Sequence, residues 1–392
     1  MTTLTLKNKH DRRLKSGHLW VFSNELESIP TDIKSGSLVQ VVSARGESFG
    51  TGVYNPQSLI AVRLLKTDAE TLDTEFFAER FKRAKELRAR LFPGEHTYRL
   101  IFGESDFLPG LVIDRFEDYF SLQILSAGME KHLPQIQEAL LKTFPDTNGI
   151  FEKNTSHLRN LEGLELREGV IWGKIPEEIK IYENGIQLSI SLLKGQKTGY
   201  FLDQRLNRQR VADFSPGLKV LDCFTNQGGF ALNAEKGGAC EVLGVDISQT
   251  AVDAGFKNAK LNNFTDKISF KTADVFEFLK AEVAAKNSWD MIILDPPAFT
   301  KSRKTVPAAK KGYASINRLA LQLIEPGGYL VTSSCSQHLE EQTFYELIQQ
   351  EADHTQCELQ LVFRGMQSPD HPVLPQMPET QYLKFFIFRV LK

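Results

Sequence analysis

The chain has 392 residues, more than one ordinary hydrophobic core accommodates, so two or three domains are expected. Its hydrophobic content of 41% and charged content of 24% are typical of a globular protein. The formal net charge of −2 excludes a molecule that binds nucleic acid over its whole surface, so any such binding must come from local patches. The charged N-terminus lacks a secretion signal, and no apolar run approaches the roughly 18 residues of a membrane span, which predicts a cytoplasmic protein.

Residues 1–70 are predicted to form a small β-rich domain. Its strand-like runs are 38–44, 48–55 and 59–65, with Gly and Asn-Pro turns between them. The segment before these runs is strongly basic and contains one acid, Asp11. Its basic residues are Lys7, Lys9, Arg12, Arg13 and Lys15. Such a run is either a solvated face or a patch that contacts phosphates.

Residues 72–185 are predicted to form an α+β domain without chemistry of its own. Residues 74–92 have apolar side chains at helical spacing. Residues 98–125 read as two strands around Gly-Glu-Ser-Asp and Pro-Gly turns. A helix over 132–144 and a strand over 149–154 are expected to follow.

From residue 187 to residue 392, strands and helices alternate. The predicted strands are 219–224, 240–247, 267–274, 290–297 and 328–335, and the predicted helices include 229–238, 250–263 and 313–328. This alternation predicts right-handed crossovers and a parallel, doubly wound α/β sheet. A final pair of strands, 358–366 and 382–392, is expected to form an antiparallel edge.

Acidic residues end three successive predicted strands, where a doubly wound sheet binds its ligands. Asp222 ends the first strand and is followed by Gly228 and Gly229, which let a backbone approach a ligand closely. Asp246 and Asp274 end the next two strands. The first turn lacks GxGxxG, which disfavours a dinucleotide. Any one of these acids could be a helix N-cap, but three in succession favour a ligand with amino-acid and ribose groups.

These stretches resemble the class I S-adenosylmethionine-dependent methyltransferases. More narrowly, the chain is similar to the PUA-domain-containing family of bacterial large-subunit ribosomal RNA cytosine-5 methyltransferases. The resemblance covers nearly the whole chain and rests on GESDFLPGLVIDRF, KTGYFLDQRLNR, DCFTNQGGF, GVDIS, LDPPAF and SSCS. It implies a PUA-like RNA-binding domain before a Rossmann-like catalytic domain, a ribosomal RNA substrate and a homodimer.

The resemblance also implies roles for individual residues toward S-adenosylmethionine. Asp203 and Arg205 would line its methionine end, and Asp222, Phe224 and Gly228 would form the floor beneath it. Asp246 would hold the ribose, Ile247 would contact the adenine, and Asp274 and Val275 would hold the adenine edge. Asp295 would face both the cofactor and the target base.

Cys335 and Asp295 are the predicted catalytic residues. They end the fifth and fourth strands, which are neighbours in the usual methyltransferase sheet. Carbon 5 of cytosine is a poor nucleophile, and a thiolate that adds to carbon 6 turns the ring into an enamine that can accept a methyl group. Asp295 could hold N3 and the exocyclic amine of the base. The alternative for Cys335 is a buried thiol that packs like a small hydrophobe.

The remaining cysteines are interpreted as packing residues. Cys223, Cys240 and Cys357 form no CxxC pair and no His/Cys spacing typical of a metal site, which predicts reduced thiols and no metal. Many RNA cytosine-5 methyltransferases carry a second cysteine after the fourth strand, whereas this chain has Pro296-Pro297-Ala298. The base that removes the C5 proton therefore has no candidate in the sequence.

Residues 300–318 form a basic stretch beside the predicted site, without one acid. Its basic residues are Lys301, Arg303, Lys304, Lys310, Lys311 and Arg318. A solvated loop would explain this composition, but a contact with the RNA backbone explains it better. Two other functions stay open. Phe299 after DPPA fits a methyltransferase that acts on a base nitrogen such as guanine N7. The chain could also be an RNA-binding assembly factor that does not catalyse a reaction.

Overall fold

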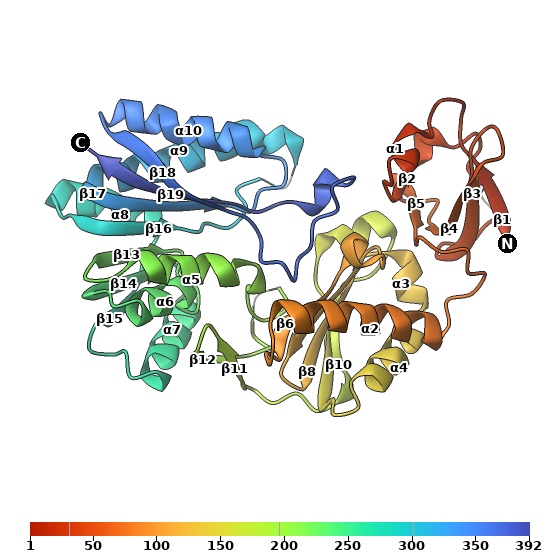
Figure 1. The fold of residues 1–392 in the computed structure, drawn as a ribbon, viewed down its shortest axis with the longest axis horizontal. Helices are drawn as coiled ribbons and strands as arrows, with labels where there is room; N and C mark the ends of the chain where they lie inside the picture. The colour runs from red at the N-terminus through yellow and green to blue at the C-terminus, as the bar shows by residue number, and fades with distance from the viewer. Residues whose placement is uncertain (31, 196, 301) are drawn as a thin grey trace. The chain divides into compact units, whose positions relative to one another are not determined.

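The computed structural model describes residues 1–30, 32–195, 197–300 and 302–392 (Figure 1). The described residues divide into two compact units. The first comprises Met1–Ile179, Ile190–Leu202 and Pro369–Thr380, and the second comprises Lys180–Ser189, Asp203–Ser368 and Gln381–Lys392. Among the described residues, no helix combines the length and the apolar composition that crossing a membrane requires.

The first unit begins with a β-sheet whose strand order is β1-β3-β4-β5-β2. The strands are β1 (Thr2–Thr5), β2 (Trp20–Phe22), β3 (Ser37–Val42), β4 (Ser48–Tyr54) and β5 (Ile60–Leu64), with the short helix α1 (Arg12–Lys15) and the 3-10 turn η1 (Ser23–Glu25). Alternate residues such as Val39 and Val41 are fully buried, as expected for a sheet with one face on the core. The three predicted strands are confirmed. Sequence reasoning missed β1 and β2, which are too short to show a period.

A second sheet in the first unit has the order β10-β9-β8-β7-β6. The strands are β6 (Thr97–Phe102), β7 (Leu111–Phe116), β8 (Tyr119–Ile124), β9 (Gly149–Asn154) and β10 (Arg167–Gly173); the helices are α2 (Thr74–Leu91), α3 (Ala127–Lys131) and α4 (Leu133–Thr143), with η2 (Gly103–Asp106) and η3 (His157–Glu162). The prediction of two strands over 98–125 is wrong, because β7 and β8 form a hairpin within the second of them. The chain reverses at Glu117, which has a φ of 57°, a position where no Gly, Asn or Pro marks the turn.

The second unit is built on a sheet with the order β15-β14-β13-β16-β17-β19-β18. Its strands are β13 (Lys219–Cys223), β14 (Glu241–Asp246), β15 (Ile268–Thr272), β16 (Trp289–Leu294), β17 (Ile324–Ser334), β18 (Glu358–Gly365) and β19 (Lys384–Leu391). Strands β13 to β17 pair in parallel, and β19 runs antiparallel to both of its neighbours. The predicted doubly wound sheet with an antiparallel edge is confirmed. The strand order changes direction at β13, so the ends of β13 and β16 flank the place where such sheets bind ligands.

Helices cover both faces of this sheet. They are α5 (Arg205–Phe214), α6 (Gly229–Lys236), α7 (Gln249–Leu261), α8 (Val275–Ala285), α9 (Val306–Leu323) and α10 (Glu341–His354), with the 3-10 turn η5 (Arg303–Thr305) before α9. The remaining elements are η4 (Leu202–Gln204), a separate strand pair of β11 (Ile179–Glu183) and β12 (Ile186–Ile190), and η6 (Pro378–Thr380), which belongs to the first unit. Helix α9 packs against α8 and α10, and α6 packs against α5 and α7 (Figure 1). The predicted helix over 313–328 is confirmed as far as Leu323, but Ile324 to Gly328 begin β17 rather than end the helix. The alternative of a solvated loop for the basic stretch does not hold over 306–318, which belong to α9.

Candidate active site

The loop from β13 to α6 has an unusual backbone. Phe224, Asn226 and Gly228 have positive φ values of 62°, 50° and 82°. Non-glycine residues rarely adopt this conformation, and strained loops of this kind concentrate at functional sites. A Cβ atom on Gly228 would lie 3.0 Å from the ring of Phe270, so a side chain at this position would crowd the loop. The predicted floor residues Phe224 and Gly228 therefore both lie in a tight loop at the end of β13.

Asp222 is a fully buried carboxyl beneath this loop. Its Oδ2 accepts hydrogen bonds from Thr225 Oγ1 at 2.6 Å and from the Ala231 backbone N–H at 3.0 Å. Its Oδ1 has no hydrogen-bond partner among the residues that the structure describes. Burial raises the pKa of Asp222 to about 7. A buried carboxyl with an unsatisfied oxygen fits the ammonium group of an amino-acid ligand, because a cation would compensate the cost of burial.

Asp246 ends β14 and joins two loops. It accepts hydrogen bonds from the backbone N–H of Asn226 at 3.0 Å and of Ser248 at 2.9 Å. The carboxylate retains lone pairs for two further hydrogen bonds, which fits a ribose diol. The next residue, Ile247, has a side chain that is 69% exposed. An exposed branched aliphatic side chain beside a carboxylate fits a flat apolar group such as adenine.

Asp274 and Val275 mark the start of α8. Asp274 is exposed and caps this helix, accepting a hydrogen bond from the Glu277 backbone N–H at 3.1 Å. The helix-cap alternative therefore describes what Asp274 does among the described residues, through one of its two oxygens. Val275 is buried in the core of the second unit.

Asp203 and Arg205 flank the junction of η4 and α5. Asp203 is largely buried and accepts a hydrogen bond from the Tyr382 hydroxyl at 2.5 Å. Arg205 is also buried, and its Nε lies 3.7 Å from a carboxylate oxygen of Glu183. Both side chains are thus positioned by contacts within the second unit, as residues that line a site require.

Asp295 follows β16 and is held by two hydrogen-bond donors. Gln204 Nε2 donates to Asp295 Oδ1 at 2.9 Å, and the hydroxyl of Ser333 donates to the same oxygen. Burial raises the pKa of Asp295, and the negative charge of Asp203 acts in the same direction. Since β16 and β17 pair in parallel, with Leu294 opposite Thr332, the predicted adjacency of the two strand ends is confirmed.

Cys335 comes directly after β17 and is partly exposed, while both serines beside it are buried. The hydroxyl of Tyr313, on α9, lies 3.0 Å from the hydroxyls of both Ser334 and Ser336. Cys335 is not part of a disulfide. A buried structural thiol would point into the core with its neighbours. Here the neighbours are fixed to α9 and buried, whereas Cys335 is only partly buried.

The other cysteines differ from Cys335. Cys223 and Cys357 are buried, and burial raises the pKa of Cys223 well above its usual value, which makes that thiol unreactive. Cys240 is exposed, so its interpretation as a packing residue is wrong. Cys240 precedes β14, at the end of the strand opposite to Asp246. Exposure alone does not make it a functional thiol.

The basic N-terminal segment is partly neutralised by acids of its own unit. Arg13 pairs with Glu25 at 2.8 Å, and Lys15 pairs with Asp11 at 2.8 Å and with Glu47 at 2.9 Å. The Lys7 ammonium donates to the Asn24 backbone carbonyl. Lys9 and Arg12 are exposed, and the structure gives neither an ion pair with another described residue.

The first basic residue of the stretch in the second unit, Lys301, comes six residues after Asp295. Lys301 lies outside the described residues. Arg303 and Lys304 form η5 and are exposed, whereas Lys310 and Lys311 are exposed on α9. The last two line a surface pocket that also contains acids of α10, namely Glu346 and Glu351. Arg318 pairs with Glu351 at 2.5 Å.

Sequence reasoning missed the residues that contact the predicted catalytic pair, Asp295 and Cys335, or the serines beside it. Gln204 lies within the FLDQR stretch, where the charged residues on either side drew attention instead. Ser333 and Tyr313 carry no local signal, because only the pairing of β16 with β17 and the packing of α9 bring them to the site. The serines beside Cys335, Ser334 and Ser336, can be seen in the sequence. A cluster of hydroxyl side chains at one strand end is the signal that could have identified them.

Comparison with known proteins agrees with this geometry. Residues 4–67 match the model of a PUA-like domain, and residues 168–389 match that of an S-adenosylmethionine-dependent methyltransferase. A solved structure from Streptococcus mutans, described as a SAM-dependent methyltransferase, is 23% identical with a TM-score of 0.85, and the match covers 99% of this chain and 100% of that one. A methyltransferase complexed with SAH is 23% identical with a TM-score of 0.87, covering 99% and 100%. These two structures support the fold.

Curated relatives extend the match over the full length. Ribosomal RNA large subunit methyltransferase I of Aliivibrio fischeri is 39% identical over 394 residues, covering 99% of both chains. Its counterpart in Vibrio cholerae is 38% identical over 387 residues, covering 97% of both. A sheet of this order, a buried carboxyl with one unsatisfied oxygen beneath a strained first loop, and relatives of this identity lead to one conclusion. The chain belongs to the S-adenosylmethionine-dependent methyltransferases and, among them, to the family of ribosomal RNA large subunit methyltransferase I.

Proposed function

We propose that this enzyme methylates carbon 5 of a cytosine in large-subunit ribosomal RNA, with Cys335 as the nucleophile. The observation that carries the proposal is the pair of partly exposed residues at two neighbouring strand ends: the thiol of Cys335 after β17 and the carboxyl of Asp295 after β16, which accepts a hydrogen bond from Ser333 of β17. The ribosomal RNA substrate is taken from the names of the relatives. The cytosine-5 chemistry is taken from the thiol, because methylation of a base nitrogen needs no covalent nucleophile.

The protein would hold S-adenosylmethionine through the acids and loop residues at the strand ends. Asp222 would meet its ammonium group, Asp246 its ribose hydroxyls and Ile247 its adenine. When bound, the cofactor supplies an electrophilic methyl group. The unsatisfied oxygen of Asp222 and the exposed side chain of Ile247 are the features of this chain that fit such a ligand. The residues that would complete the site are Asp203, Arg205, Phe224, Gly228, Asp274 and Val275.

The reaction begins when the Cys335 thiolate attacks carbon 6 and forms a carbon–sulfur bond. The electrons of the C5–C6 double bond move toward carbon 5, which then takes the methyl group. Loss of the C5 proton restores the double bond and expels the thiolate. Because the pKa of Asp295 is raised by burial, this carboxyl can share a proton with ring N3 while carbon 6 is attacked. No second thiol follows β16, so the C5 proton passes to water in this scheme.

The RNA would be held by exposed basic side chains. Arg303 and Lys304 follow Asp295 in the chain and are exposed, and Lys310 and Lys311 are exposed on α9. In the PUA-like domain, Lys9 and Arg12 would contribute with Lys7 and Arg13. The target base would have to leave its stack to reach a thiol at a strand end. An enzyme that acts on ribosomal RNA would work in the cytoplasm. The family resemblance also suggests a homodimer, which light scattering would test.

Ribosomal RNA from a strain that lacks this gene tests the proposal. We expect nucleoside mass spectrometry to show the loss of one 5-methylcytosine from the large subunit, restored by the wild-type gene but not by Cys335→Ala. Loss of an N-methylated base instead would contradict the cytosine-5 chemistry. Unchanged modification would contradict an enzymatic role and favour an assembly factor.

A further inference from the structure

Lys384 is a buried lysine on the strand next to the catalytic cysteine. It begins β19, which pairs antiparallel with β17, and it lies directly opposite Ser334. Its side chain is only 5% exposed. Lysine is almost never buried this fully without a partner for its charge. The position of Lys384 therefore calls for an explanation.

The ammonium group of Lys384 is held at the loop that carries Cys335. Nζ donates to the Ser336 backbone carbonyl at 2.7 Å and to the Tyr382 backbone carbonyl at 2.8 Å. An ammonium group has three hydrogens to donate, and the described residues provide these two acceptors. Neither acceptor is a charged group. The hydrogen bonds fix the ammonium beside the residue that follows Cys335 but leave its charge uncompensated.

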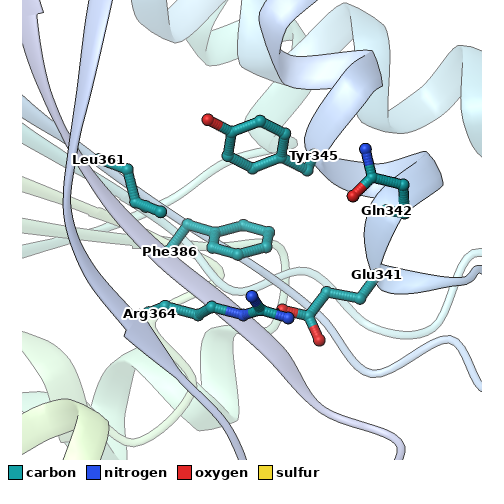
Figure 2. Close-up of a pocket in the computed structure, with 6 residues that line it drawn as sticks. All are labelled: Glu341, Gln342, Tyr345, Leu361, Arg364 and Phe386. Carbon is teal, nitrogen blue, oxygen red and sulfur yellow. The ribbon is translucent and has the colours of Figure 1, made fainter.

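Two acidic groups lie close enough to act on this charge. Burial lowers the pKa of Lys384 to about 8, while the negative charges of Cys335 and Glu341 act in the opposite direction. Glu341, on α10, forms an ion pair with Arg364 of β18. Figure 2 shows the Glu341 carboxylate beside the Arg364 guanidinium in a surface pocket that Phe386, Tyr345, Leu361 and Gln342 complete. Glu341 is thus already compensated, and Cys335 is the remaining counter-charge for Lys384.

Two other titratable groups near the Cys335 loop are described, and neither is a cation. Tyr313, on α9, has its pKa raised by burial, with the charge of Cys335 acting in the same direction, so its hydroxyl stays neutral. Asp295, after β16, is an acid. An unassisted thiol has a pKa of about 8.5 and is mostly protonated at neutral pH. A nearby cation is one way to favour the thiolate, and among the described residues Lys384 is a cation held at the loop that carries Cys335.

We infer that the Lys384 ammonium stabilises Cys335 as a thiolate before RNA binds, so that the nucleophile is already charged when the target base arrives. The inference rests on the proposed function of Cys335. The thiol proton is released to water, and no bond to Lys384 forms. Lys384 is thus a positioning residue that acts through the sulfur. Cys335 and Lys384 titrate as a coupled pair, with the thiolate–ammonium form populated near neutral pH.

Alkylation of Cys335 measures this effect without RNA or cofactor. The full-length protein is treated with iodoacetamide between pH 5.5 and 9.5, and mass spectrometry of the Cys335 peptide gives the rate at each pH. Exposed Cys240 is an internal reference in the same sample. The variants are Lys384→Met, which removes the charge at similar length, and Lys384→Arg, which keeps it. Lys392→Met is the matched control, because Lys392 also donates to a carbonyl of β17, that of Ile324, at the other end of the strand.

We expect Lys384→Met to slow alkylation of Cys335 at pH 7 by about tenfold, which corresponds to a rise of about one unit in the thiol pKa. Lys384→Arg and Lys392→Met should retain the wild-type pH profile, and Cys240 should not change in any variant. A wild-type pH profile of Cys335 alkylation in a folded Lys384→Met protein would overturn the inference. A tenfold slower alkylation in Lys384→Arg as well would also overturn it, because that result would indicate a structural effect rather than an effect of charge. If instead Cys335→Ala still methylates RNA, the proposed function fails, whatever the alkylation profile shows.

Discussion

Single acidic residues in this site differ because their surroundings differ. Asp222 is fully buried and keeps one oxygen without a partner among the described residues, so the pKa of its carboxyl rises to about 7. Asp246 instead accepts two backbone N–H groups and organises the loops around it. Asp274 is exposed and caps a helix. In the sequence, all three are aspartates at strand ends. Only the structure distinguishes Asp222, whose unsatisfied oxygen fits a cation, from Asp246 and Asp274, which organise a loop and a helix end.

The raised pKa of Asp222 predicts a pH-dependent affinity for S-adenosylmethionine. An ammonium partner favours the ionised carboxylate, while the unbound protein holds the proton below pH 7. Each pH unit below about 7 should therefore weaken binding by roughly tenfold, and affinity should level off above this pH. Calorimetry at pH 6 and pH 8 would measure the change. Asp222→Asn should bind weakly at both values, and an equal wild-type affinity at both would contradict the assigned role.

Replacement of Asp246 tests the ribose contact. Asp246→Ala should weaken S-adenosylmethionine binding by about 1.5–3 kcal/mol, the range for hydrogen bonds to a charged group. The matched control is Asp253→Ala on α7, an exposed aspartate whose carboxylate contacts only Gln249 among the described residues. Unchanged affinity in Asp246→Ala, measured by calorimetry, would rule out the assignment.

At the scale of elements, the site is a set of strand ends that loops and helices hold in place. The sequence predicted the parallel strands and the residues at their ends, because apolar runs and terminal acids are local features. It could not predict Ser333 with Asp295 or Lys384 with Ser336, since these pairs depend on strand pairing across long separations. The hairpin at Glu117 was missed for a different reason, because its Glu-Asp turn contains no Gly, Asn or Pro, the residues that mark a tight turn most clearly.

The loop after β13 gives a prediction for an element. Gly228→Ala places a Cβ 3.0 Å from Phe270 and forces alanine to a φ of 82°. Gly217→Ala shares the positive φ, at 74°, but its Cβ meets nothing within 4 Å. Both variants should lose about 1–2 kcal/mol of unfolding free energy from the backbone conformation. Only Gly228→Ala should also lose cofactor affinity in calorimetry, and equal affinity in both variants would contradict a ligand-binding role for the loop.

At the scale of the whole molecule, the net charge of −2 hides two local basic regions in different compact units. Ion pairs within the first unit neutralise Arg13 and Lys15, which reduces the patch that the sequence suggested. In the second unit, Lys310 and Lys311 are exposed on α9, although acids of α10 lie in the same pocket. Binding of RNA should therefore rest on few phosphate contacts and depend moderately on salt.

Charge reversal measures the contribution of α9 to RNA binding. Lys310→Glu with Lys311→Glu should weaken binding, and the slope of log affinity against log salt should fall by just under one unit for each phosphate that the variant no longer neutralises. The matched control is Lys257→Glu with Lys260→Glu, two exposed lysines on α7. Cofactor affinity should stay unchanged in both. A wild-type salt slope in the α9 variant would show that these lysines do not touch the RNA backbone.

The central claim, that Cys335 forms a covalent bond with the target cytosine, is tested most directly with RNA that carries 5-fluorocytosine at the methylated position. Fluorine cannot leave as the proton does, so the adduct should accumulate. We expect denaturing mass spectrometry to show a species with the mass of protein plus RNA plus one methyl group, absent from Cys335→Ala, whose cofactor affinity should be retained. Methylation of unmodified RNA by Cys335→Ala, or the lack of any adduct with the active wild-type enzyme, would contradict the claim.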